Sequence, residues 1–235
     1  MMNASEELGK LLAEQGHLCL NGGGRFGCMG GLNAGVLKNK GRAEGVIHEM
    51  FLGRTDVTKT DEGQAGLQRM DVATGPTLAE RKRLLLNRAD CFICLPGGPG
   101  TLDETFEVIC ERQLGLPLGV VPRPVCLLNV NGYWDSLMAQ LRRAQKDGLL
   151  YKTAEEIVYC TESPADALKW CTTEVERLRE MHHDVLPTAA EALETHSGAR
   201  SGKSQYPEGV AHGMALALGV GIVAMMIPRM SSLRG

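Results

Sequence analysis

A short apolar run that stops at a cluster of glycines, with a helical pattern directly behind it, constrains this chain more than any other feature. Residues 91–95 read as a buried strand, residues 96–100 supply three glycines, and residues 101–114 show helical periodicity. Glycines let backbone N–H groups approach a ligand closely, and the free amides and dipole at a helix start favour phosphate. The segment therefore predicts an anion-binding loop, beside which Glu104 either has a chemical task or caps the helix. The apolar face predicted for the helix contains Leu102, Phe106, Ile109 and Cys110.

The same order of strand, glycine loop and helix occurs near the start of the chain. Residues 17–20 read as a buried strand, residues 22–31 are rich in glycine, and a helix follows to about residue 38. Strands and helices then alternate to about residue 182. This alternation predicts an α/β fold, with a Rossmann-like, mostly parallel sheet and helices on both faces. Ligands of such sheets bind at the carboxyl ends of the strands, where both glycine loops fall.

The length and the composition divide the chain into three parts. We expect a nucleotide-binding domain over residues 1–183, a linker rich in proline and glycine over 184–208, and an apolar tail over 209–235. Residues 210–227 contain no Asp, Glu, Lys or Arg, and basic residues flank them on both sides, so a C-terminal membrane anchor is one hypothesis. The other hypotheses are a helix packed on the domain or an oligomer contact, and a tail with no fixed role.

The charge and the cysteines narrow the possible partners and compartment. A net charge of -3 and a pI near 6.1 argue against binding of nucleic acid through bulk electrostatics, so small molecules or a second copy are the expected partners. The eight cysteines lie mostly in apolar runs, and the first residues lack the pattern of a signal peptide, which favours a cytoplasmic location. Cys91 and Cys94 have no second pair at ligand spacing, so we expect core packing and no metal site.

The first glycine loop admits two interpretations. Residues 22–27 (GGGRFG) match the glycine spacing of the dinucleotide fingerprint, and Glu44 or Glu49 lies at nearly the distance of a ribose-binding acid. A phosphate or ribose loop for a mononucleotide explains the same glycines without a redox cofactor, and its candidate residues are Gly23 and Gly24.

Three segments together resemble the signature of a known family. Residues 22–30 (GGGRFGCMG), 80–82 (ERK) and 96–104 (PGGPGTLDE) are similar to the LOG family, cytokinin riboside 5′-monophosphate phosphoribohydrolases once labelled lysine decarboxylases. The resemblance runs from about residue 4 to residue 180, and relative to the family the chain lacks the usual first strand. It implies a homodimer that hydrolyses the N-glycosidic bond of a cytokinin or purine nucleoside 5′-monophosphate, without metal or cofactor.

The resemblance also implies roles for individual residues. Arg81 and Glu104 occupy the positions of the catalytic pair: the carboxylate would stabilise positive charge on the ribose and orient or deprotonate the attacking water. Arg81 would hold Glu104 ionised or bind the ribose or phosphate. Lys82 would be a second ribose or phosphate ligand, whereas Asp103 and Glu107 would compensate the helix dipole. The residues that would hold the 5′-phosphate are Gly97, Gly98, Gly100 and Thr101.

Two other function classes have to be compared with the hydrolase. One is a nucleotide or cofactor carrier, like the related molybdenum-cofactor carrier proteins, which would bind without turnover. The presence of both Arg81 and Glu104 favours the enzyme over the carrier. The other is lysine decarboxylation with pyridoxal phosphate, which needs a Schiff-base lysine in a large cofactor domain, and the sequence offers no candidate.

Overall fold

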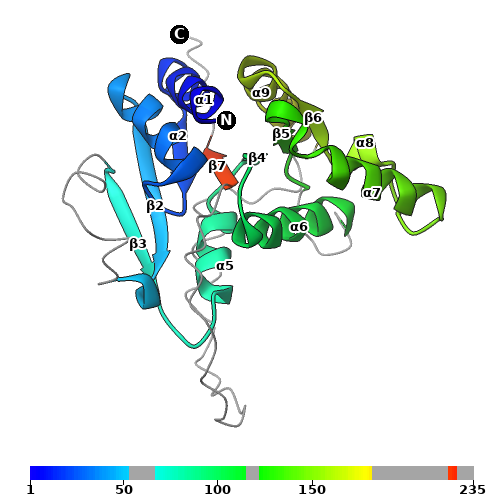
Figure 1. Cartoon of the computed structure of the whole chain (residues 1–235), viewed down its shortest axis with the longest axis horizontal. Coiled ribbons are helices and arrows are strands. Elements are labelled where there is room, and N and C mark those ends of the chain that lie inside the picture. The colour runs from blue at the N-terminus through cyan, green and yellow to red at the C-terminus, as the bar shows by residue number, and fades with distance from the viewer. Residues whose placement is uncertain (53–66, 115–121, 182–221, 227–235) are drawn as a thin grey trace.

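The described residues form a seven-stranded sheet between two layers of helices (Figure 1). The computed structural model describes residues 1–52, 67–114, 122–181 and 222–226. The strands are β1 (Leu18–Asn21), β2 (Arg42–His48), β3 (Arg69–Ala73), β4 (Cys91–Cys94), β5 (Val125–Leu128), β6 (Tyr159–Thr161) and β7 (Ile222–Met226). Their order across the sheet is β3-β2-β1-β7-β4-β5-β6. All neighbours pair in parallel except β7, which is antiparallel to both β1 and β4.

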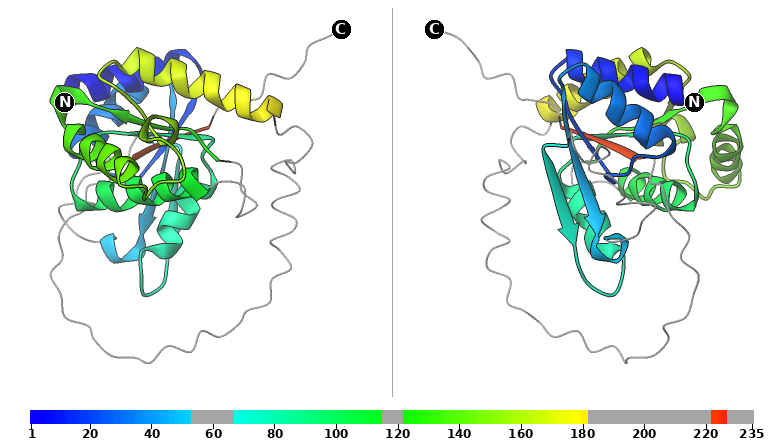
Figure 2. Two further views of the ribbon diagram at one scale, coloured as in Figure 1. Left: turned by 90° about the vertical axis from the view of Figure 1, so that its right-hand side faces the viewer. Right: turned by 60° about the vertical axis from the view of Figure 1, so that its left-hand side comes forward.

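The helices cover both faces of this sheet, as the alternating sequence predicts (Figures 1 and 2). Their bounds are α1 (Met2–Glu14), α2 (Gly27–Lys38), α5 (Ala79–Asn87), α6 (Pro99–Leu114), α7 (Asp135–Lys146), α8 (Ala154–Ile157) and α9 (Pro164–Met181). One hydrophobic cluster joins the sheet to α1, α2 and α9, and a second joins it to α5, α6, α7 and α8. The α/β fold class is therefore confirmed.

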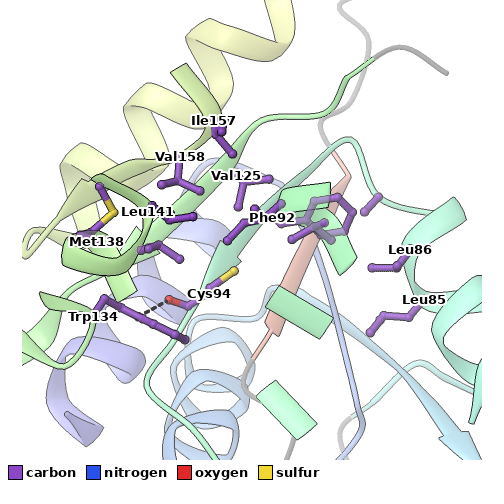
Figure 3. Packing of buried hydrophobic residues seen from close by; sticks show 14 of the residues in the cluster. Leu85, Leu86, Phe92, Cys94, Val125, Trp134, Met138, Leu141, Ile157 and Val158 are labelled. Carbon is purple, nitrogen blue, oxygen red and sulfur yellow. Dashed lines mark hydrogen bonds between the residues drawn. The ribbon is translucent and has the colours of Figure 1, made fainter. Parts of the chain in front are cut away.

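The side chains of β4 point alternately to the two faces of the sheet and so contribute to both hydrophobic clusters. Phe92 and Cys94 pack on the side of α5 to α8, which Figure 3 shows from close by, whereas Cys91 and Ile93 pack on the side of α1, α2 and α9. All four side chains are fully buried. Cys91 and Cys94 therefore point to opposite faces, which confirms that this pair packs in the core. The described part of the chain contains no group of residues arranged to hold a metal ion.

Strand β7 comes from the stretch for which the sequence suggests an apolar tail or an anchor. Residues 222–226 form the central strand of the sheet, so the domain extends beyond the range 1–183. These five residues adopt an extended conformation and not a helix. The linker 184–208 and the rest of the tail lie outside the described residues. No helix in the described ranges has the length and apolarity that crossing a membrane requires.

Helix α6 differs from its expected form in its start and in its buried face. It begins at Pro99, because proline is well tolerated in the first turn of a helix. Of the predicted apolar face only Ile109 is buried, and Leu102, Phe106 and Cys110 are exposed. The apolar pattern was misleading here because polar side chains occupy the inward face. The buried residues of α6 are Gly100, Thr101, Glu104, Thr105, Val108, Ile109 and Arg112.

Helices α1 and α2 pack with their backbones almost in contact at two glycines. A Cβ atom at Gly35 would lie 2.0 Å from the carbonyl oxygen of Glu6, and one at Gly9 would lie 2.2 Å from that of Leu32. We expect Gly35→Ala to lower the free energy of unfolding by about 1–3 kcal/mol, because the helices must separate. Urea denaturation measures this change. Gly98→Ala is the control, since its Cβ would meet no atom within 4 Å, and an equal loss in both variants would contradict the prediction.

Candidate active site

The described pocket opens between the start of α5 and the start of α6, near the carboxyl ends of β2 and β4. It has a volume of about 250 Å³. Four of the residues to which the sequence assigns a site role lie together in its wall. The complete lining is Phe51, Leu78, Arg81, Lys82, Pro99, Gly100, Asp103 and Glu104.

The centre of this wall is a buried ion pair between the two helices. Arg81 Nη1 donates to Glu104 Oε1 over 2.8 Å, and the two residues are only 4% and 1% exposed. Arg81 Nε donates to the backbone carbonyl of Val46 in β2, at 3.1 Å. A guanidinium group can make both bonds at once because its donors form a rigid planar fork. Arg81 therefore ties α5 to the sheet while it fixes the carboxylate on α6.

The surroundings of Glu104 shift the pKa of its carboxyl group. Burial raises the pKa of Glu104 to about 7, and Arg81 opposes this rise while the charges of Asp103 and Glu107 add to it. Its second oxygen, Oε2, is buried and has no hydrogen-bond partner within the described residues. A carboxylate with an unused acceptor can take a water molecule or a ligand hydroxyl group. Near neutral pH, Glu104 can hence exist in either protonation state.

Lys82 lies in the same wall but is held by carboxylates. Its Nζ lies 3.1 Å from Asp103 Oδ2 and 2.8 Å from Glu107 Oε2, and these contacts raise the pKa of Lys82. Asp103 and Glu107, expected to compensate the helix dipole, thus form a bridge from α6 to α5. The role of Lys82 as a ribose or phosphate ligand stays a prediction, and a phosphate would have to compete with two carboxylates for it.

The second glycine loop is folded tightly against the start of α6. A Cβ atom at Gly97 would lie 2.1 Å from Thr101 Oγ1, so only glycine fits above this fully buried side chain. The hydroxyl group of Tyr133 donates to the carbonyl oxygen of Gly97. Gly98 is exposed, whereas Gly100 is buried and lines the pocket. The loop therefore offers backbone at Gly98 and Gly100, with Gly97 and Thr101 as its packed base.

Two backbone N–H groups of the first glycine loop are engaged by side chains that lie close to them in the sequence. The N–H of Gly23 donates to Asn21 Oδ1 at 2.8 Å, and that of Gly24 points to the sulfur of Met29 at 3.3 Å. Neither glycine lines the described pocket. Their role in binding a mononucleotide remains a prediction.

Both candidates for the ribose-binding acid of a dinucleotide fingerprint are engaged in other contacts. Glu44 forms an ion pair with Arg88, and Glu49 accepts a hydrogen bond from the N–H of Gly75 at 3.1 Å. Since both candidates are already engaged, the structure gives the fingerprint no ribose-binding acid.

Two apolar residues of the wall were not assigned a site role from the sequence. Phe51 ends a short 3-10 helix (Glu49–Phe51) that directly follows β2, and Leu78 directly precedes α5. The available signal was their position at the carboxyl end of a strand and at a helix start, where ligands of such sheets bind. The sequence alone did not separate these residues from ordinary core residues.

Comparison with known proteins gives one family. The family model described as possible lysine decarboxylase matches residues 29–171. A probable cytokinin riboside 5′-monophosphate phosphoribohydrolase of Oryza sativa subsp. japonica is 38% identical over 63% of this chain and 60% of its own length. A second rice protein of that description is 31% identical over 85% of this chain and 73% of its own. A cytokinin riboside 5′-monophosphate phosphoribohydrolase of Arabidopsis thaliana is 33% identical over 71% of this chain and 73% of its own length.

Solved structures agree with the fold. The molybdenum cofactor binding protein from Rippkaea orientalis has a TM-score of 0.51 at 21% identity, covering 74% of this chain and 87% of that one. The molybdenum cofactor carrier protein from Chlamydomonas reinhardtii has a TM-score of 0.50 at 19% identity, covering 75% and 88%. At these identities the likeness concerns the fold alone. The family model covers more than half of the chain, and rice and Arabidopsis relatives above 30% identity match over most of both sequences: the chain belongs to the LOG family.

Proposed function

We propose that this protein hydrolyses the N-glycosidic bond of a nucleoside 5′-monophosphate, with a cytokinin or another purine as the base, to the free base and ribose 5-phosphate. The names of the relatives in rice and Arabidopsis support this reaction. The observation that carries the proposal is the buried pair of Arg81 and Glu104 in the wall of the pocket. A carboxylate held in this way can stabilise the positive charge that develops on the ribose when a C1′–N bond breaks.

The chemistry follows from the charges that develop as the bond breaks. The ribose ring becomes oxocarbenium-like and positive, and the departing base becomes negative. Ionised Glu104 would stabilise the ring, and its unpaired Oε2 would orient the attacking water or take its proton. Arg81 would keep the carboxylate in place and partly ionised despite its burial.

The rest of the pocket supports a nucleotide of this kind. The backbone at Gly98 and Gly100 lies at the start of α6, where free N–H groups and the helix dipole favour the 5′-phosphate. Phe51 and Leu78 provide apolar surface for the base. The surroundings of the pocket thus offer one group for each part of the substrate: phosphate, ribose and base.

Product analysis tests the proposal. The protein is incubated with AMP and with isopentenyladenosine 5′-monophosphate, and free base is separated from nucleotide by chromatography. We expect base release from at least one of them, and the ratio of the two rates gives the base preference. Binding of a nucleotide without release of base would contradict the hydrolase and favour the carrier.

The pH dependence should report the state of Glu104. Because the ionised carboxylate is the reactive form and its pKa is raised to about 7, kcat/KM is expected to fall as the pH drops below about 7. Lys82→Met leaves Asp103 and Glu107 without their cation, so the midpoint of this fall should move to higher pH. A midpoint in the ordinary range of glutamate would contradict the assignment.

We also propose a homodimer, in which a second copy covers the exposed apolar stripe of α6. Phe106, 44% exposed, is at its centre, and such a stripe on a soluble surface is typical of protein contacts. The stripe consists of Leu102, Phe106, Cys110 and Leu114. Light scattering should give a dimer for the parent and a monomer for Phe106→Glu.

The eight unpaired cysteines support a reducing, cytoplasmic location.

A further inference from the structure

Strand β7 occupies a slot in the middle of the sheet, between β1 and β4 (Figures 1 and 2). The slot separates two half-sheets, β3-β2-β1 and β4-β5-β6, and within the described residues every strand pairing between them passes through β7. Residues 182–221 lie between the end of α9 and the start of β7 along the chain. The central position is therefore filled by a segment that is remote in sequence from both neighbours.

The register places β7 beside both glycine loops. Ala224 pairs with Leu20 in β1 and with Phe92 in β4, and Ile222 pairs with Cys94. Strand β1 runs directly into the first glycine loop, and β4 runs into the second through Leu95. Helix α6, which carries Glu104, contacts β7 as well. The position of β7 thus determines how the two loops and α6 lie relative to one another.

The slot has the chemistry of a binding site for an extended apolar segment. Its walls are two strands whose residues are all buried, so their inward N–H and C=O groups need hydrogen-bond partners from the protein. The carbonyl oxygen of Met225 accepts from the N–H of Asp90 at 2.8 Å. The side chain of Met225 is fully buried against the helices α1, α2 and α9, whereas that of Met226 is 38% exposed.

We propose that the slot between β1 and β4 is a strand-binding site and that residues 222–226 are its ligand, in the manner of a donor strand. Occupancy of the slot positions the two glycine loops and α6, so the C-terminal segment is a functional part of the nucleotide site and not an appendage to it. The inference that β7 positions the nucleotide site rests on the proposed function. The inference that the slot binds residues 222–226 as a strand rests on the strand pairing alone.

Cleavage of the folded protein tests strand binding. A specific protease site is introduced in the full chain between residues 195 and 196, and the protein is cut and passed over a gel filtration column without denaturant. We expect the C-terminal fragment to co-elute with the large fragment, and a labelled synthetic peptide of residues 219–229 to replace it slowly. Separation of the fragments, with an unchanged circular dichroism melting curve of the large one, would overturn the proposal.

Two neighbouring substitutions provide matched variants in the same cleavable chain. Met225→Asp places a carboxylate in the buried position and should release the fragment after cutting, whereas Met226→Asp, on the exposed side, should retain it. Calorimetry with AMP should show Kd raised at least tenfold for Met225→Asp and unchanged for Met226→Asp. This binding readout is independent of hydrolysis, so a protein that binds AMP without cleaving it still tests the proposal. Release of the fragment with unchanged AMP affinity would contradict the link to the site.

Discussion

Replacement of Glu104 by glutamine is expected to reduce kcat/KM for nucleotide cleavage by about 10³-fold. Glutamine keeps the size of the side chain and can still accept from Arg81 Nη1, but it cannot stabilise a positive ribose ring or take a proton. The ground-state contacts survive, so the loss should appear in kcat with little change in KM. Initial rates over a range of substrate concentrations measure both constants.

Glu111→Gln is the matched control for this variant. Glu111 lies on the same helix and pairs with Arg123, with 2.5 Å between Oε2 and Nη2, outside the pocket lining. Its replacement removes the same charge from α6 and should leave kcat/KM nearly unchanged. Arg81→Lys should resemble Glu104→Gln, because an ammonium group cannot bond the carboxylate and the Val46 carbonyl in the planar geometry of a guanidinium. Equal activity of the Glu104 and Glu111 variants would refute the assigned role.

Trp134→Ala is expected to lower the free energy of unfolding by about 3–5 kcal/mol. Trp134 is buried in the cluster under β4, and its Nε1 donates to the carbonyl oxygen of Cys94 at 3.2 Å (Figure 3). The substitution leaves a cavity and removes the partner of that carbonyl. For a domain of this size the melting temperature should fall by about 6–20 °C. Differential scanning calorimetry measures the shift.

Trp134→Phe separates the two contributions. It retains most of the ring and loses the bond to Cys94, so the expected loss is about 1 kcal/mol from the hydrogen bond plus a smaller packing term. Cys94 is the last residue of β4, and Tyr133 beside Trp134 binds Gly97 in the following loop. If Trp134→Ala melted like the parent, packing under β4 would not contribute as described.

The sequence predicts those parts of the fold that depend on local patterns. Apolar runs such as 91–95 and glycine clusters such as 96–100 signal strand and turn through residues that lie next to one another. The pairing of Arg81 with Glu104 could be anticipated only through the family resemblance, because the two residues meet across two helices. The ion pairs of Lys82 with α6 depend on the same packing and were not anticipated.

The errors have physical causes as well. The inward face of α6 carries Thr101, Glu104 and Thr105, because the site and the tight loop need polar groups there, and an apolar pattern assigns such residues to solvent. Residues 222–226 belong to an uncharged stretch whose composition suits a helix as well as a strand. Only the slot between two distant strands decides between these conformations, and no local pattern contains that information.

The central place of β7 has a consequence for synthesis on the ribosome. Strands β1 and β7 are roughly 200 residues apart in the sequence. At a synthesis rate of about 5–20 residues per second, β7 is therefore made about 10–40 s after β1. During that time the inner edges of β1 and β4, both rich in apolar residues, have no β7 to pair with. The nascent chain therefore presents these two strand edges without β7 until residues 222–226 have been synthesised. Chaperones that shield apolar strands should associate with it during this interval.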